Sequence, residues 1–153
     1  MLAIQKNSEL KFEPDKQLIQ HLAEIALPLL CNNPQNHSFG IHFTTDEEMR
    51  SLNADYRGLD QTTDVLSFEA HTFDPEQNVT YLGDIIISVP KMKSQALQAE
   101  HSQATEMLLL ITHGLLHLFG YDHATSQEKN EMWALQNQIL EMAGHPPNRI
   151  IED

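Results

Sequence analysis

Three histidines near residue 120 are spaced as ligands of a single metal ion. His113 and His117 are four residues apart within the strongest helical pattern of the chain, Glu106 to Phe119. Residues i and i+4 share one face of a helix, so both imidazoles can reach one ion at about 2 Å. Gly120 can end this helix, because glycine readily adopts a positive φ, and His123 then follows as a third ligand. Three protein ligands leave a fourth position open for water, which is a catalytic arrangement.

The spacing H-x-x-x-H-x-x-G-x-x-H is also that of the metzincin metallopeptidases. In those enzymes a glutamate directly after the first histidine acts as general base, and this chain has Gly114 at that place. The histidines could instead be satisfied core or surface residues, but neighbouring leucines already supply an apolar helix face. The pattern therefore predicts a metal-dependent hydrolase that lacks the proton acceptor of the usual peptidase mechanism.

Strands alternating with helices must position these histidines, which favours an α/β or α+β fold with a small mixed sheet of about four strands. The expected strands are Leu2–Leu10 at a sheet edge, Ser38–Thr44, Thr63–Phe68 and Tyr81–Ser88, with a loop over His71–Asn78. The expected helices begin at Pro14 or Asp15, Thr45, Pro90, Gln103 and Ser126, and they end near Leu30, Tyr56, Ala99, Phe119 and Ala143. We expect the tail Asn148–Asp153 to be frayed.

Length and composition indicate a single domain over residues 1–153. The sequence has no run of about 18 apolar residues and no basic segment of the kind that precedes a signal sequence, so we expect neither a membrane span nor a signal peptide. Cys31 is the only cysteine. The chain therefore has no disulfide framework, which favours the reducing cytoplasm, and Cys31 is expected to pack in the core.

The formal net charge of −13 disfavours anionic partners such as RNA, because phosphate binding depends on cations. An RNA-binding hypothesis therefore needs a bound metal, a partner that delivers the substrate, or a local basic patch. The clustered cations that could form such a patch are Arg50, Arg57, Lys91 and Lys93.

The segment His113–His123, HGLLHLFGYDH, closely resembles the signature of the YbeY family of bacterial endoribonucleases. Two further blocks resemble the family in the same order, and together the three blocks lie between about residues 40 and 125. They are Asn53-x-x-Tyr56-Arg57 followed by Thr63-Asp64-Val-Leu-Ser-Phe68, and Leu82-Gly83-Asp84-Ile-Ile-Ile-Ser88. The family carries proline where this chain has Glu69.

The resemblance implies a zincin-like fold and one zinc or similar divalent ion on His113, His117 and His123. It also implies cleavage of single-stranded RNA, with roles in 16S rRNA 3′-end processing, maturation of the small ribosomal subunit and ribosome quality control. Arg57 matches a functionally important arginine of the family, and we expect Arg57 and His113 to be catalytic. A guanidinium there could hold a phosphate bidentately. The alternative is a surface arginine paired with Asp55 or Asp60.

Three functions remain open from the sequence. The first is the metal-dependent endoribonuclease, the second a metallopeptidase or other hydrolase, and the third a ribosome assembly factor with a mainly structural metal. Among the acids near the motifs, Asp64 could orient a ligand histidine or cap the strand entrance, and Asp122 is expected to make a local turn bond.

Overall fold

A four-stranded mixed sheet forms the centre of the computed structural model, which describes residues 2–151. Its strands are β1 (Leu2–Lys6), β2 (His37–Thr44), β3 (Val65–Asp74) and β4 (Val79–Ser88), in the order β1-β2-β4-β3. The β1–β2 and β2–β4 pairs are parallel, and β3 runs antiparallel to β4. The expected small mixed sheet, with the N-terminal strand at its edge, is confirmed.

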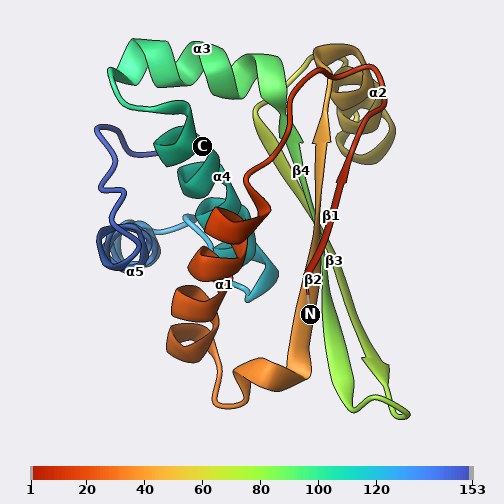
Figure 1. Ribbon diagram of the computed structural model, residues 1–153, viewed down its shortest axis with the longest axis vertical. Helices are drawn as coiled ribbons and strands as arrows, with labels where there is room; N and C mark the ends of the chain where they lie inside the picture. Colours follow the sequence, from red (N-terminus) through yellow and green to blue (C-terminus); the bar gives the residue numbers. More distant parts are fainter. Residues whose placement is uncertain (1, 152–153) are drawn as a thin grey trace.

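Within residues 2–151, five α-helices surround the sheet where the sequence predicts them, and a short 3-10 helix, Pro34–Asn36, precedes β2. The α-helices are α1 (Lys16–Leu30), α2 (Asp46–Arg57), α3 (Val89–Ala99), α4 (Gln103–Leu118) and α5 (Ser126–Met142). Helices α1, α4 and α5 lie on one side of the sheet and α2 on the other (Figure 1). No helix within residues 2–151 is long and apolar enough to span a membrane.

Helix α4 is the central element of the main core. Its residues are buried almost without interruption from Thr105 to Leu118, between the sheet and helices α1, α3 and α5. Ser102 caps its N-terminus by accepting a hydrogen bond from the Thr105 amide at 3.0 Å. Gly120, with a φ of +90°, turns the chain away after its last turn, as predicted. The metal-ligand spacing is therefore carried by the most buried helix of the fold.

The segment His71–Asn78, expected as a loop, is strand as far as Asp74 and turn over residues 75–78. Strand β3 continues to Asp74 and β4 begins at Val79, and a register shift between Glu69 and Thr72 interrupts their pairing. Figure 1 shows this hairpin reaching beyond the helices. Its side chains are largely exposed, so it lacks the apolar alternation by which a half-buried strand is recognised.

Helix α1 buries a different stripe from the one predicted. The helical spacing of the large apolar residues predicts a face of Leu18, Leu22, Ile25 and Leu29, but Leu29 is 38% exposed. The buried residues are Ile19, Leu22, Ala23 and Ala26. The two small alanines allow α1 to pack closely against its neighbours, so the buried stripe is rotated by about one residue from the line of large side chains.

Cys31 lies at the C-terminal end of α1 and is half-buried, less than the core position expected. Its Sγ lies 3.3 Å from the carbonyl oxygen of Leu27. Desolvation raises the pKa of the thiol, so Cys31 stays protonated near neutral pH.

The C-terminal segment is held against α4 and α5 as far as it is described, so the prediction of a frayed tail is wrong up to Ile151; residues 152 and 153 lie outside the described range. Ile151 is buried, and its carbonyl accepts a hydrogen bond from the Trp133 indole at 2.9 Å. Arg149 forms an ion pair with the fully buried carboxylate of Glu106. The buried side chain of His101 contacts the same carboxylate at 2.8 Å.

We predict that Arg149→Met lowers the free energy of unfolding by about 3 kcal/mol, because it leaves the Glu106 carboxylate buried without its main cation. Chemical denaturation measures the change. In a Glu106→Gln background, Arg149→Met should lower the free energy of unfolding by clearly less. Arg50→Met, which removes an exposed ion pair with Asp60, serves as the control and should change stability little. Equal losses for Arg149→Met in both backgrounds would contradict the ion-pair explanation.

Candidate metal centre

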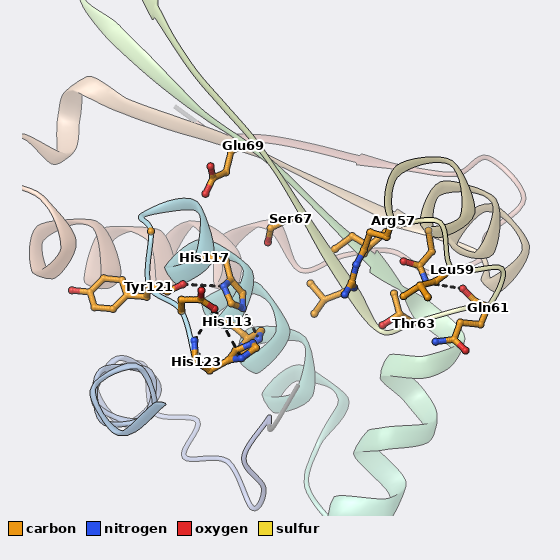
Figure 2. A pocket seen from close by; sticks show the side chains of 15 residues that line it. Arg57, Leu59, Gln61, Thr63, Ser67, Glu69, His113, His117, Tyr121 and His123 are labelled. Atoms are coloured by element: carbon orange, nitrogen blue, oxygen red, sulfur yellow. Dashed lines mark hydrogen bonds and ion pairs between the residues drawn. The ribbon is translucent and has the colours of Figure 1, made fainter. Parts of the chain in front are cut away.

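The three predicted histidines converge at the C-terminal end of α4 (Figure 2). His113 is buried, and His117 and His123 are half-buried. Each offers one ring nitrogen, and these nitrogens all lie within 4.8 Å of one another. The Nε2 atoms of His113 and His117 are 3.1 Å apart. The spacing inferred from the sequence therefore corresponds to a real cluster in space.

Hydrogen bonds from the Nδ1 atoms orient two of these rings. His117 Nδ1 lies 3.0 Å from the backbone carbonyl of Tyr121, and a carbonyl can only accept, so Nδ1 carries the hydrogen. His113 Nδ1 lies 3.1 Å from Gln136 Oε1 and donates in the same way. In both neutral rings Nε2 then carries a lone pair. A partner that fixes the tautomer through the second nitrogen is a general feature of metal-ligating histidines.

This arrangement fits a divalent cation. Two lone pairs facing each other at 3.1 Å repel unless a cation accepts both of them. Nitrogens bound to one tetrahedral zinc at about 2.1 Å lie about 3.4 Å apart, which is close to the separation of His113 and His117. Three neutral imidazoles form the ligand set of a catalytic site with one position left for water or substrate. The residues present could therefore hold zinc or a similar ion.

Gln136, on α5, is the residue of the site that sequence reasoning missed. Its side chain is fully buried, and its Nε2 has no hydrogen-bond partner among the described residues. The sequence does contain a signal for it. The buried face of α5 consists of Met132, Gln136, Ile139 and Leu140, so an amide occupies a core position of an amphipathic helix. A polar residue at such a position indicates a buried polar partner, which here is His113.

The histidines form one wall of an open cleft of about 580 Å³. Ser67 and Glu69 of β3 line the cleft, as does Arg57 at the end of α2. Figure 2 shows Arg57 and Thr63 across the cleft from the imidazoles. The cleft therefore brings together the predicted metal ligands and the predicted catalytic arginine, which are about 60 residues apart in the sequence.

The Arg57 guanidinium is exposed and forms no ion pair among residues 2–151. The alternative expectation was a surface pair with Asp55 or Asp60, but Asp60 pairs with Arg50, at 2.8 Å from its Nε. Of the four cations proposed as a phosphate-binding strip, Arg57 alone lines the cleft. The positive charge of the site is therefore concentrated at one arginine, together with any metal held by the histidines.

Asn53 shapes the wall of the cleft that carries Arg57. It is buried one helical turn before Arg57, and its Nδ2 donates to the carbonyl of Gln61 at 2.9 Å. Its own carbonyl accepts from the amide of Leu59 at 3.3 Å. Gly58, with a φ of +70°, ends α2 between them. These bonds hold the loop after α2 so that Leu59 and Gln61 line the cleft.

Gly114 faces the sheet and not the cleft. A Cβ atom at this position would lie 2.8 Å from Ile85 Cγ2 and 3.1 Å from Ser67 Oγ, which is too close for any side chain. Ser67 Oγ donates to the Gly114 carbonyl at 3.0 Å, so helix and strand are in direct contact here. The glycine that replaces the peptidase glutamate is therefore needed for packing, and a side chain at 114 would require Ile85 or Ser67 to shift.

The acidic residues near the motifs have local roles. Asp64 accepts from the Val65 amide at 2.8 Å and lies 3.8 Å from Arg149, so it caps the strand entrance and does not orient a histidine. Asp122 accepts from the His123 amide at 2.7 Å, which is the local turn bond expected. Asp84 accepts from the Tyr81 hydroxyl.

Comparison with known proteins identifies the family of this chain. The sequence model of the family described as "Endoribonuclease YbeY" matches residues 2–144. The chain belongs to the endoribonuclease YbeY family. Two relatives with that description come from Shouchella clausii (strain KSM-K16), 37% identical over 94% of this chain and 96% of the relative, and from Geobacillus sp. (strain WCH70), 42% identical over 84% of each. The resemblance inferred from the three sequence blocks is thus confirmed.

A solved structure supports the fold. The solution structure of TM1509 from Thermotoga maritima aligns with a TM-score of 0.62 at 24% identity, and the alignment covers 94% of this chain and 89% of that chain. At this identity the likeness supports the arrangement of the sheet and helices alone.

We predict that Gln136→Leu weakens zinc binding by about 10- to 100-fold, because His113 loses the acceptor that fixes its tautomer. Gln136→Glu should retain or tighten binding, since a carboxylate still accepts from Nδ1. Competition with a chromogenic chelator measures both affinities. Asn137→Leu, at the next position of α5, is the matched control and should bind zinc like the parent chain. The role of Gln136 would be refuted if Gln136→Leu folded normally and bound zinc with unchanged affinity.

Proposed function

We propose that this chain is a metal-dependent endoribonuclease that cleaves single-stranded RNA, with one zinc or similar divalent ion held by His113, His117 and His123. The observation that carries the proposal is the convergence of three imidazoles, two of them fixed through Nδ1, in an open cleft that also contains Arg57. Membership of a family described as an endoribonuclease supports RNA as the substrate class.

The side chains of the cleft have distinct roles in this proposal. A bound divalent ion supplies Lewis-acid chemistry, polarising a phosphoryl oxygen and lowering the pKa of water near it. Arg57 binds the same phosphate and stabilises the negative charge that builds on it during cleavage. His113 acts as part of the ligand set, and Gln136 keeps its ring in the binding orientation. Because Gly114 faces the sheet, the residue at this position takes no part in proton transfer.

The acidic character of the chain is compatible with an RNA substrate, because a divalent ion on the histidines would make the cleft locally positive. A divalent ion on neutral imidazoles adds two charges within reach of Arg57, and the net charge of −13 is spread over the whole molecule. The nearest acidic residues lining the cleft are Glu69 and Asp122, and both are exposed, so solvent screens them.

The two alternatives have less support. A metallopeptidase would need a general base after His113, and the packing of Gly114 against Ile85 leaves no room for one. A purely structural metal is normally closed by four protein ligands, whereas the side chains assembled here are three histidines that line a cleft. We further propose that the chain works in the cytoplasm on precursors of 16S rRNA, at the small ribosomal subunit, in its maturation and quality control.

Cleavage of a labelled single-stranded RNA tests the proposal. We expect Arg57→Ala to keep its fold and its metal but to cut about 100- to 1,000-fold more slowly, as when a charge-stabilising group is removed from other active sites. His117→Ala should lose both metal and cleavage. Arg50→Ala, on the same helix but paired with Asp60, should cut like the parent chain.

Casein, tested in parallel, should remain intact. The endoribonuclease proposal would be refuted if Arg57→Ala and His117→Ala, purified in the same way, cut RNA as fast as the parent chain. In that case the activity would come from a contaminating nuclease. Digestion of casein that depends on His117 would favour the peptidase instead.

A further inference from the structure

We propose that Tyr56, supported by Phe68, is a stacking platform for a nucleobase next to the phosphate bound by Arg57. The inference rests on the proposed function, since it assigns a subsite for the RNA substrate. Tyr56 is 69% exposed, although an aromatic ring of this size is normally at least partly covered. Its ring centroid lies 4.9 Å from that of Phe68, with an angle of 56° between the planes.

The ring of Tyr56 is held in place from one side. Phe68 packs, with Leu52, against a small apolar cluster of Met49, Leu66 and Ile86 between α2 and the sheet. Phe68 is therefore fixed, and Tyr56 leans on it with the rest of its ring open to solvent. Tyrosine has only two side-chain torsions, so a ring supported in this way loses little further entropy when a base stacks on it.

Both residues of the platform are sequence neighbours of residues that line the cleft. Tyr56 directly precedes Arg57 at the end of α2. Phe68 stands between Ser67 and Glu69, which both line the cleft, so the alternation of side chains along a strand places Phe68 on the opposite face of β3, around its edge from the cleft. Because β3 is an edge strand of the sheet, an RNA strand can pass over this edge without crossing another strand. A phosphate at Arg57 then places a neighbouring base within reach of Tyr56.

Stacking also provides a source of RNA affinity that a strongly acidic chain can use. With a net charge of −13 and one arginine in the cleft, affinity for RNA cannot come mainly from phosphate neutralisation. Base–aromatic stacking does not depend on charge, accepts any base, and is a common source of affinity for single-stranded nucleic acid. It favours single strands, because the bases of a duplex are already stacked on one another.

Binding of short single-stranded RNA by the full chain tests the platform. His117→Ala is the background, so that cleavage does not interfere. The RNA carries 2-aminopurine at one position at a time, and the fluorescence of this base falls when it stacks on an aromatic ring. We expect one position to be quenched, Tyr56→Phe to preserve the quenching, and Tyr56→Ala to abolish it and weaken binding about 10-fold or more.

An abasic residue at the quenched position provides a second, independent measurement. It should weaken binding to the Tyr56-containing chain but have little effect on Tyr56→Ala. Phe73→Ala is the matched control, because Phe73 is an aromatic side chain that is 55% exposed at the far end of β3, and it should bind RNA like the background chain.

The stacking proposal would be overturned if Tyr56→Ala bound RNA as tightly as the background chain, or if abasic residues weakened both proteins equally. These binding results are independent of catalysis. Stacking on Tyr56 without cleavage by the metal-loaded parent chain would contradict the endoribonuclease proposal and leave the platform intact.

Discussion

The site depends on two hydrogen bonds that hold the Nδ1 atoms of His113 and His117. Both bonds end on oxygen atoms that can only accept, so both rings present the lone pair of Nε2 to the same point. The partners come from different parts of the chain, since Gln136 belongs to α5 and Tyr121 to the turn after α4. The packing of α5 against α4 and the turn at Gly120 therefore determine whether the histidines can act together.

Other contacts of the fold also determine where the histidines and Arg57 lie. Helix α4 packs so closely against the sheet at Gly114 that a side chain there would require a neighbouring atom to shift. This contact determines how near the part of α4 that carries His113 and His117 lies to β3. Phe68 of the same strand packs against Tyr56 at the end of α2, and the neighbouring Arg57 lines the cleft together with the imidazoles. The glycine that excludes a peptidase-type base is thus also the residue that brings the metal ligands to the cleft.

The ligands could be predicted from the sequence because they lie within eleven residues, where helical periodicity and one glycine decide the geometry. Arg57, on the opposite wall of the cleft, was predicted through the family resemblance, because no local sequence pattern places it near His113. Gln136 was missed because its partner lies 23 residues away, in another helix. The β3–β4 hairpin and the C-terminal segment were missed because strand pairing and the Glu106–Arg149 ion pair are long-range contacts, and local patterns do not record them.

The most direct test of the central claim is X-ray absorption at the zinc edge on the full chain loaded with one equivalent of zinc. Three converging imidazoles, two of them held through Nδ1, predict one tightly bound ion per chain, with three nitrogen ligands at about 2.0–2.1 Å and one additional oxygen ligand. A spectrum with fewer than three imidazoles, or a chain that retains no stoichiometric zinc, would contradict it. The three histidines would then be a packing feature, and the chemistry of the cleft would have to be sought elsewhere.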